Sequence, residues 1–366
     1  MKRSLLLLVT AVLSLSMLLL PGCGATDDGA TESEMVKIGM VTDSGTIDDK
    51  SFNQGTWEGI VAFVEDNPEL AEYKYLQPSG EQHTDYLNAI TDLVDTGHSI
   101  IVTPGFKFET AVNEAAETFA DQATFILIDG MTHNGDMNFV KHDNVVCIFF
   151  NEHEAGFLAG VAAALSTKTG KVAFIGGMEI PPVQRFGWGF KAGVDYAVKN
   201  YGATAEVVDY LYQGTFNDVA AGQTLAAGMY NKGIDIIFAA AGGVGVGVFN
   251  EAKQRVEKGE EVYVVGVDVD QYEFGKTSTG KSVTLTSAMK QIDVAAYDYI
   301  AKKIDGSFPG GEIITMTLAD NGVGIPAENP NLTADVLAKV EEAKQAILAG
   351  SVEVPSTQEA LDAFLQ

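Results

Sequence analysis

Short apolar runs alternate with longer amphipathic stretches along almost the whole chain after residue 35. The short runs are rich in β-branched residues, as strands are, and the longer stretches have the apolar spacing of helices. We expect strands at residues 36–42, 73–77, 99–103, 124–129, 171–175, 205–210, 235–239, 262–267, 283–286 and 313–318. We expect helices at residues 51–65, 82–95, 109–121, 152–166, 183–199, 219–231, 246–258, 292–304 and 333–348. This alternation predicts an α/β fold with parallel sheets flanked by helices.

The length of the chain and the order of these elements predict two lobes. A chain of 366 residues corresponds to about two domains of ~150 residues each. Its 46% hydrophobic residues are enough to build two cores. A first set of strand and helix units ends near Asn151, where a second set begins. We therefore expect two similar doubly wound lobes.

Carboxylates, small residues and aromatic residues follow the expected strands. In open parallel sheets, ligands bind beyond the carboxyl ends of the strands. The residues at those ends are Asp43, Thr103-Pro104-Gly105, Asp129-Gly130, Gly176-Gly177, Gly214-Thr215-Phe216, Ala241-Gly242-Gly243 and Asp268. If both lobes direct these ends toward one cleft, the set surrounds a small polar ligand with aromatic or hydroxylated surface.

The segment from Asp43 to Trp57 holds the densest group of such residues. Asp48 or Ser51 is expected to cap the helix that carries Phe52. Capping accounts for one acidic residue only, whereas Asp43 and Asp49 accompany Phe52 and Asn53. An aromatic ring beside carboxylate and amide groups is suited to a heteroaromatic base, which stacks on the ring and forms hydrogen bonds at its edge.

Charge and motif content argue against several other classes of protein. The chain carries 23 Lys and Arg against 50 Asp and Glu, a net charge of -27. Such a chain repels phosphate backbones, so we expect no nucleic-acid partner. The sequence contains no phosphate-binding loop, no His-Glu-x-x-His motif and no Gly-x-Ser-x-Gly motif. We therefore expect no catalytic residues, no metal and no cofactor.

The glycines at positions 242, 243, 245 and 247 have the appearance of a dinucleotide-binding fingerprint. The required third glycine is absent, because Val248 and Asn250 stand where it should be. The loop is better interpreted as a helix N-terminus that comes close to a ligand.

The first 35 residues predict export and attachment to a membrane. Residues 1–22 have the basic start and apolar run of a signal peptide. The sequence Leu20-Pro21-Gly22-Cys23 resembles the bacterial lipobox, which implies that Cys23 carries a lipid anchor with fatty acyl chains such as palmitate. The alternative is a plain signal peptide with an incidental cysteine. Residues 23–35 lack the apolar surface needed to fold and are expected to form a flexible tether. The second cysteine, Cys147, is expected to be a buried free thiol.

Several motifs together resemble the basic membrane protein family of bacterial lipoproteins, of the purine nucleoside receptor A type. They extend in order from about residue 36 to about residue 320. The matching stretches are Thr42-Asp43, residues 48–54 (Asp-Asp-Lys-Ser-Phe-Asn-Gln), residues 154–160 (Glu-Ala-Gly-Phe-Leu-Ala-Gly), residues 190–193 (Phe-Lys-Ala-Gly), Ala241-Gly242-Gly243, residues 265–268 (Val-Gly-Val-Asp), Asp270-Gln271 and residues 286–290 (Thr-Ser-Ala-Met-Lys).

The resemblance implies the type I periplasmic-binding-protein fold, with two doubly wound lobes and three crossovers. The N-terminal lobe would contain residues 36–150 plus about 287–310. The C-terminal lobe would contain residues 151–286 plus about 311–366. The implied location is the extracytoplasmic side of the cell membrane, and the implied partners are an ABC permease and ATPase complex that receives purine nucleosides.

The resemblance also implies the roles of individual residues. Phe52 and Phe216 would sandwich the purine, and Asp43 and Asn53 would bind its edge, beside Asp49. Asp268 and Lys290 would hold the ribose hydroxyls, with Asp129 as a further ribose contact and Gly243 allowing the backbone to approach the sugar. The sequence departs from the family pattern near Arg185 and Trp188, at a turn expected to face the cleft. Both are candidates to narrow or reshape the pocket, and helix packing is the alternative for Trp188.

Three alternatives stay open at this stage. A receptor for a free sugar or a furanose signal would have the same fold. A surface sensor or adhesion lipoprotein would act through a protein partner instead. A nucleoside-cleaving enzyme would bind the same ligand and hydrolyse it.

Overall fold

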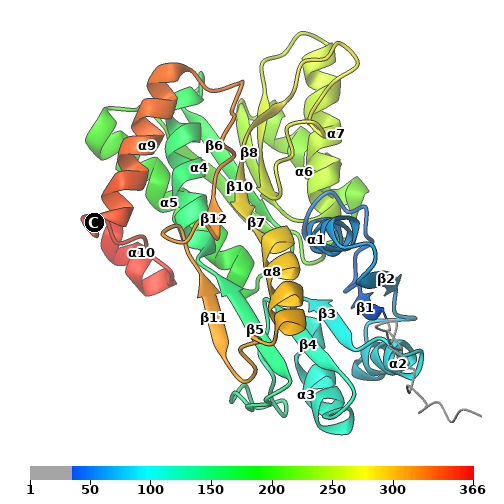
Figure 1. Cartoon of the computed structure of the whole chain (residues 1–366). Coiled ribbons are helices and arrows are strands. Elements are labelled where there is room, and N and C mark those ends of the chain that lie inside the picture. The colour runs from blue at the N-terminus through cyan, green and yellow to red at the C-terminus, as the bar shows by residue number, and fades with distance from the viewer. Residues whose placement is uncertain (1–34) are drawn as a thin grey trace, which may run out of the picture. The chain divides into compact units, whose positions relative to one another are not determined.

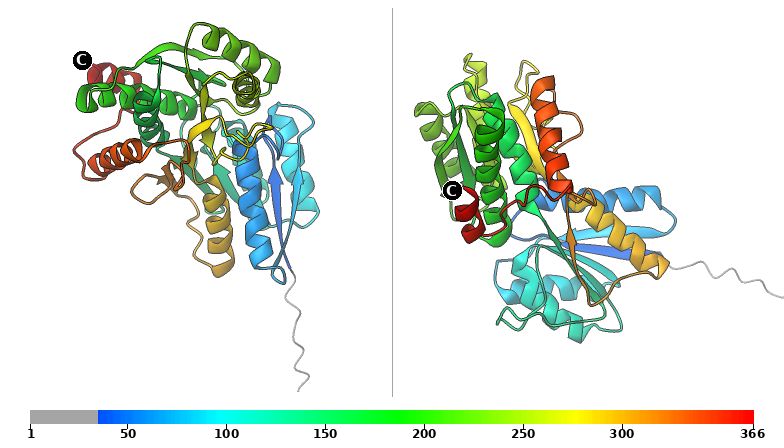
Figure 2. Two further views of the ribbon diagram at one scale, coloured as in Figure 1. Left: turned by 90° about the horizontal axis from the view of Figure 1, so that it is seen from above. Right: turned by 90° about the vertical axis from the view of Figure 1, so that its left-hand side faces the viewer.

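The computed structural model describes residues 35–366, and these form two lobes, each built on one six-stranded sheet (Figures 1 and 2). The first sheet has the strand order β11-β5-β4-β3-β1-β2 and is parallel throughout. Its strands are β1 (Val36–Val41), β2 (Ala71–Leu76), β3 (Ile100–Pro104), β4 (Thr124–Ile128), β5 (Val145–Phe150) and β11 (Ile313–Met316).

The second sheet has the order β12-β10-β9-β8-β6-β7. Its strands are β6 (Lys171–Gly176), β7 (Glu206–Tyr212), β8 (Ile236–Ala240), β9 (Tyr263–Asp268), β10 (Thr284–Lys290) and β12 (Val323–Gly324). All of its pairings are parallel except that of the short β12 with β10. The two sheets therefore repeat one architecture, as the alternating sequence pattern predicts.

Helices cover both faces of each sheet. In the first lobe, α1 (Phe52–Asp66) and α8 (Ile292–Asp305) pack on the opposite face from α2 (His83–Asp95), the short helix η1 (Phe106–Phe108) and α3 (Glu109–Thr118). The alternation of strand side chains produces this division, because Ile126 faces α1 and α8 whereas the adjacent Leu127 faces α2 and α3.

The second lobe follows the same plan. The helices α4 (Glu152–Ser166) and α5 (Pro181–Tyr201) cover one face of its sheet, and α6 (Val219–Asn231) and α7 (Gly243–Glu257) cover the other. The last two helices, α9 (Ala334–Leu348) and α10 (Gln358–Phe364), pack beside α4 and α5 (Figure 1). The predicted doubly wound, two-lobed fold is confirmed.

The chain passes between the lobes three times. It crosses from β5 to α4, from β10 to α8 and from β11 to β12. The expected lobe boundaries, at about residues 287 and 311, each lie a few residues before a crossover. Strand β10 stays in the second sheet to Lys290, and β11 pairs with β5 in the first sheet, because both continue the hydrogen-bond ladders of those sheets. The first lobe therefore gains its last helix and strand between the second and third crossovers.

Strand β5 is absent from the expected strands. Its sequence, Val-Val-Cys-Ile-Phe-Phe, is apolar on both faces and lacks the alternation that marks a half-buried strand. Cys147 lies within it, buried and unpaired among the described residues, as expected.

The predicted signal peptide, Cys23 and all of the predicted tether except Met35 lie outside the described residues. Within residues 35–366, no helix is both long and apolar enough to cross a membrane.

Candidate ligand-binding site

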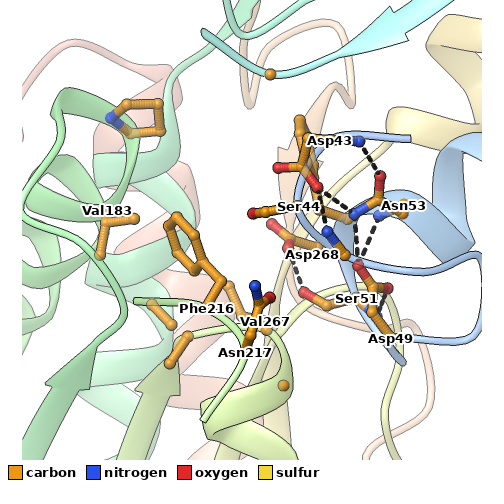
Figure 3. A pocket seen from close by; sticks show the side chains of 18 of the residues that line it. Asp43, Ser44, Asp49, Ser51, Asn53, Val183, Phe216, Asn217, Val267 and Asp268 are labelled. Carbon is orange, nitrogen blue, oxygen red and sulfur yellow. Dashed lines mark hydrogen bonds between the residues drawn. The ribbon is translucent and has the colours of Figure 1, made fainter. Parts of the chain in front are cut away.

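A cavity of about 540 Å³ lies between the lobes, at the carboxyl ends of both sheets. This volume is in the range of pockets that enclose small organic ligands. Figure 3 shows Asp43, Ser44 and Asp268 on one side of the cavity, with Phe216 and Val183 on the other. The structure brings all nine sequence-predicted binding residues to its wall: Asp43, Asp49, Phe52, Asn53, Asp129, Phe216, Gly243, Asp268 and Lys290.

Asp43, Asn53 and Asp49 form one hydrogen-bonded network at the start of α1 (Figure 3). The Asn53 amide donates from Nδ2 to Asp43 Oδ1 and to Asp49 Oδ2, at 2.8 Å each. Asn53 Oδ1 accepts a hydrogen bond of 3.1 Å from the Asp43 backbone N–H. Both amide hydrogens of Asn53 are therefore committed within the protein. Burial raises the pKa of the Asp43 carboxyl, against hydrogen bonds from Gly45 and Asn53 that lower it.

Ser51 is at the N-cap position of α1, one of the two positions expected, but its side chain makes no capping hydrogen bond, and the Asp49 carboxylate accepts from the helix N-terminus instead. Asp49 Oδ1 accepts from the backbone N–H groups of Ser51 and Gln54, at 2.9 and 3.1 Å. Its Oδ2 accepts from the Asn53 backbone N–H at 3.0 Å, in addition to the Asn53 side chain. These four bonds fill the acceptor sites of a carboxylate. Asp49 therefore fixes the helix start and the Asn53 amide, although it lies at the cavity wall.

Lys290 is the buried cation of the site. Its side chain is 3% exposed, and Nζ forms an ion pair with Asp129 Oδ2 and lies 3.6 Å from Asp268 Oδ1. The ammonium also lies 4.7 Å from the ring centre of Phe52, a cation–π distance. Burial alone lowers the pKa of Lys290, but Asp129, Asp268 and Glu152 together raise it above its ordinary value. Lys290 is therefore charged at neutral pH.

Asp129 and Asp268 reach Lys290 because the backbone turns sharply where their strands end. Both have left-handed backbone angles, with φ of 55° at Asp129 and 65° at Asp268. Asp tolerates this conformation better than most residues with a side chain, and such strained positions cluster at functional sites. Asp129 Oδ1 is buried and has no hydrogen-bond partner among the described residues. An unpartnered buried acceptor is costly unless a ligand or water completes it.

Direct contacts join the two lobes at the edge of the cavity. The Ser51 hydroxyl, in the first lobe, donates to Asp268 Oδ2 in the second lobe at 2.5 Å. The Gln271 amide donates to the Lys50 carbonyl oxygen at 2.5 Å. The Lys290–Asp129 ion pair also connects the lobes. Burial raises the pKa of the Asp268 carboxyl, whereas Lys290 and Ser51 lower it.

Aromatic rings and glycines shape the rest of the cavity. Phe52 lines it from the first lobe and Phe216 from the second. A Cβ atom at Gly177 would lie 2.3 Å from the Phe216 ring, so only glycine leaves room for this ring. Gly243 begins α7 at the cavity wall, and a Cβ atom there would lie 2.8 Å from the Phe216 carbonyl oxygen. The loop at the N-terminus of α7 thus comes close to the cavity, as expected.

Arg185 and Trp188 do not line the cavity. Arg185 donates from Nε to the buried Glu152 carboxylate at 2.6 Å, and Trp188 donates to Gln358 of α10 at 3.1 Å. The cavity wall from this part of the chain is formed instead by apolar side chains that the sequence analysis did not select: Ile180, Pro182, Val183 and Phe186.

Two polar residues were also missed. The sequence pattern indicates Ser51 only as a helix cap, and Glu152 only as the first residue of the expected helix at 152–166. Neither neighbouring sequence nor residue type indicates their contacts, because Ser51 meets a residue 217 positions away. The strand-end rule identifies Asp268, and the partner of Asp268 becomes visible only in three dimensions.

Comparison with known proteins identifies the family. Residues 36–358 match the model of the family described as ABC transporter substrate-binding protein PnrA-like. This chain belongs to that family. Its members bind a solute for an ABC transporter, so the prediction of a binding protein in place of an enzyme is confirmed. Such a protein works outside the cytoplasm with a permease and ATPase complex.

Curated relatives are similar over nearly their full length. A Lactococcus lactis subsp. cremoris protein named ABC transporter nucleoside-binding protein BmpA is 34% identical, over 95% of this chain and 98% of that protein. A Listeria monocytogenes protein named CD4+ T-cell-stimulating antigen is 37% identical, over 97% of this chain and 99% of that protein. Basic membrane protein D of Borreliella burgdorferi is 30% identical, over 96% of each chain.

Solved structures support the fold. An ABC transporter solute-binding protein from Aeropyrum pernix has a TM-score of 0.75 at 24% identity and covers 90% of this chain and 96% of its own. A similar protein from Conexibacter woesei has a TM-score of 0.66 at 20% identity and covers 88% of this chain and 99% of its own. At these identities the likeness concerns the architecture alone.

Proposed function

We propose that this substrate-binding protein captures purine nucleosides such as adenosine, guanosine and inosine in the cavity between its lobes. The observation that carries the proposal is the combination of two aromatic rings from opposite lobes with a buried, unpartnered carboxylate oxygen of Asp129. A flat heteroaromatic base can stack between the two rings, and a sugar hydroxyl can donate a hydrogen bond to the unpartnered carboxylate oxygen.

The base would stack between Phe52 and Phe216. Asp43 would accept hydrogen bonds from the edge of the base, because no residue within 35–366 donates to Oδ2, while Oδ1 already accepts from Gly45 and Asn53. We assign Asn53 and Asp49 to hold Asp43 in place, since both amide hydrogens of Asn53 are used within the network. This arrangement favours bases with N–H donors at the edge that meets Asp43.

The ribose would meet the charged end of the cavity. Its hydroxyls would donate to Asp129 and Asp268 and accept from Lys290, in bonds strengthened by charge. Gly243 would let the backbone approach the sugar without a side chain between them. Because carboxylates outnumber the single lysine at the wall, the cavity repels phosphate groups and suits an uncharged nucleoside.

The name of the Lactococcus lactis relative supports a nucleoside ligand. A free sugar would cover less of the two rings than a flat heteroaromatic base, which favours a nucleoside over a receptor for ribose.

Calorimetric titration with inosine, guanosine, adenosine and free ribose tests the proposal. We expect nucleosides to bind more tightly than ribose by about fivefold to 150-fold, because stacking of a base contributes about 1–3 kcal/mol. Native mass spectrometry of freshly purified protein would identify a retained ligand. Equal affinity for ribose and inosine would refute the base site, and release of hypoxanthine from inosine would indicate hydrolysis instead of transport.

We further propose that Cys23 carries the lipid anchor that holds the protein at the cell membrane. The support is the lipobox-like sequence Leu20-Pro21-Gly22-Cys23 after an apolar run. In the producing cell, Cys23→Ala should move the protein from the membrane fraction to the medium or periplasm and remove the mass of the acyl chains. Retention of Cys23→Ala in the membrane fraction would refute the anchor.

A further inference from the structure

A buried carboxylate lies behind the cavity, at the first crossover between the lobes. Glu152 is the first residue of α4, where the chain has just left β5 of the first lobe. Its side chain is fully buried and does not contribute to the cavity wall. A charge at such a place is poorly screened, so its energy is decided by the groups around it.

Glu152 contacts two cations of the second lobe. Oε2 accepts the hydrogen bond from Arg185, and Oε1 lies 3.8 Å from Lys290 Nζ. Oε1 has no hydrogen-bond partner among the described residues. Lys290 thus has Asp129 and Asp268 at the cavity and Glu152 at the crossover, and the three carboxylates together determine where its ammonium rests.

The charges around Glu152 do not cancel when it is ionised. Lys290 and Arg185 supply two positive charges, whereas Asp129, Asp268 and Glu152 supply three negative charges. The neighbouring His153 adds none at neutral pH, because burial and the Arg185 charge lower its pKa to about 4. One proton on Glu152 would make the buried cluster neutral.

Such a proton is available near neutral pH. Burial raises the pKa of Glu152 to about 7, with Asp129 adding to the rise and with Arg185 and Lys290 opposing it. Ligand binding removes water from the cavity and gives Lys290 a new acceptor on the ligand. Both changes weaken the stabilisation of the ionised Glu152 carboxylate and favour its protonated form.

We propose that Glu152 is a positioning residue of the ligand site, which holds Lys290 from behind and takes up a proton from solvent when a ligand engages Lys290. The proton bonds to a carboxylate oxygen of Glu152, for which Oε1 is open. The inference rests on the proposed function only in its use of a hydroxyl-bearing ligand, here a nucleoside.

Calorimetry of inosine binding in two buffers with different ionisation enthalpies measures this proton directly. We expect wild-type protein to take up a fraction of one proton near pH 7. Its affinity should increase from pH 8 to pH 6 by about fivefold, at the low end of usual coupling between sites. Glu152→Gln imitates the protonated carboxyl, so it should bind inosine without proton uptake and with little dependence on pH. Glu152→Ala, which removes the support behind Lys290, should bind more weakly at every pH.

Two further variants make the test specific. Glu154→Gln changes a partly buried carboxyl on the same helix that bonds to the Leu318 backbone instead of Lys290, and it should keep the wild-type proton uptake. Arg185→Met removes the cation that lowers the pKa of Glu152, so the pH of maximal uptake should increase. If circular dichroism shows that Glu152→Gln does not fold, the pH of maximal proton uptake in Arg185→Met tests the role of Glu152 instead.

The outcomes separate this inference from the proposed function. Inosine binding with the same proton uptake in wild type and Glu152→Gln, or with no uptake in wild type, would overturn the role of Glu152 and leave the proposed function intact. An unchanged pH of maximal uptake in Arg185→Met would also overturn it. Absence of nucleoside binding by the wild type at any pH would overturn both.

Discussion

Replacing Asp268 with Asn tests the charged end of the cavity with little disturbance of the fold. Asp268 is buried, accepts from Ser51 and lies 3.6 Å from Lys290. Its backbone is left-handed, with φ of 65°, a conformation that Asn adopts readily and Ala does not. Asp268→Asn therefore keeps the shape and the turn, and it removes the negative charge.

The size of the effect follows from the bond that is weakened. A hydrogen bond to a charged group contributes about 1.5–3 kcal/mol. Each 1.4 kcal/mol is a factor of ten, so the Kd for inosine should increase by about 12-fold to 150-fold. Asp129 and Lys290 remain in place, so binding should be weakened and not abolished.

Isothermal titration calorimetry at pH 7 measures this change. Asp270→Asn is the matched control, because Asp270 is exposed and its Oδ1 only accepts from the nearby Tyr272 backbone. The control should bind like wild type. Unchanged affinity in Asp268→Asn, or an equal loss in Asp270→Asn, would refute the assignment of Asp268 to the ligand.

Other variants address stacking, packing and pH. Phe216→Ala should weaken inosine binding by about 1–3 kcal/mol through lost stacking; calorimetry with an unchanged Kd would contradict the aromatic sandwich. Gly177→Ala should weaken inosine binding by about fivefold to 150-fold, since its Cβ would displace the Phe216 ring and remove stacking of about 1–3 kcal/mol. Gly228→Ala, with open space around it, is the control, and equal affinities of the two variants would refute the packing argument. Burial and Arg185 lower the pKa of His153 from 6.5 to about 4. Between pH 6.5 and pH 4 the His153 imidazole is protonated in the unfolded chain and neutral in the folded protein. The free energy of unfolding therefore keeps its full value above pH 6.5 and decreases as the pH falls toward 4, by up to about 3 kcal/mol. Urea denaturation at pH 7 and pH 5 should show a smaller loss in His153→Gln, and the same loss in both proteins would exclude His153 as its source.

Residues at strand ends were predictable because topology alone brings them together. Parallel sheets present their carboxyl ends on one side, so Asp43, Asp129 and Asp268 converge at the cavity whatever the details of packing. Lys290 was named from family resemblance, and its position at the end of β10 places it by the same rule.

Roles within the site were less predictable, because one residue type serves several purposes. Asp49 has the sequence context of a ligand acceptor, but its oxygens are used by the N-terminus of α1. Glu152 and Arg185 meet across two helices, and no local pattern indicates that pairing. Strand β5 was missed because burial on both faces removes the alternation on which strand prediction depends.

The contacts between the lobes have a consequence for ligand affinity. Ser51 with Asp268, Gln271 with Lys50 and Lys290 with Asp129 join the lobes through groups of the protein itself. Two of these contacts use Asp268, Asp129 and Lys290, which also line the cavity. A ligand that binds these groups therefore exchanges bonds with them, and its net affinity is the difference between the bonds that it forms and the bonds that it weakens.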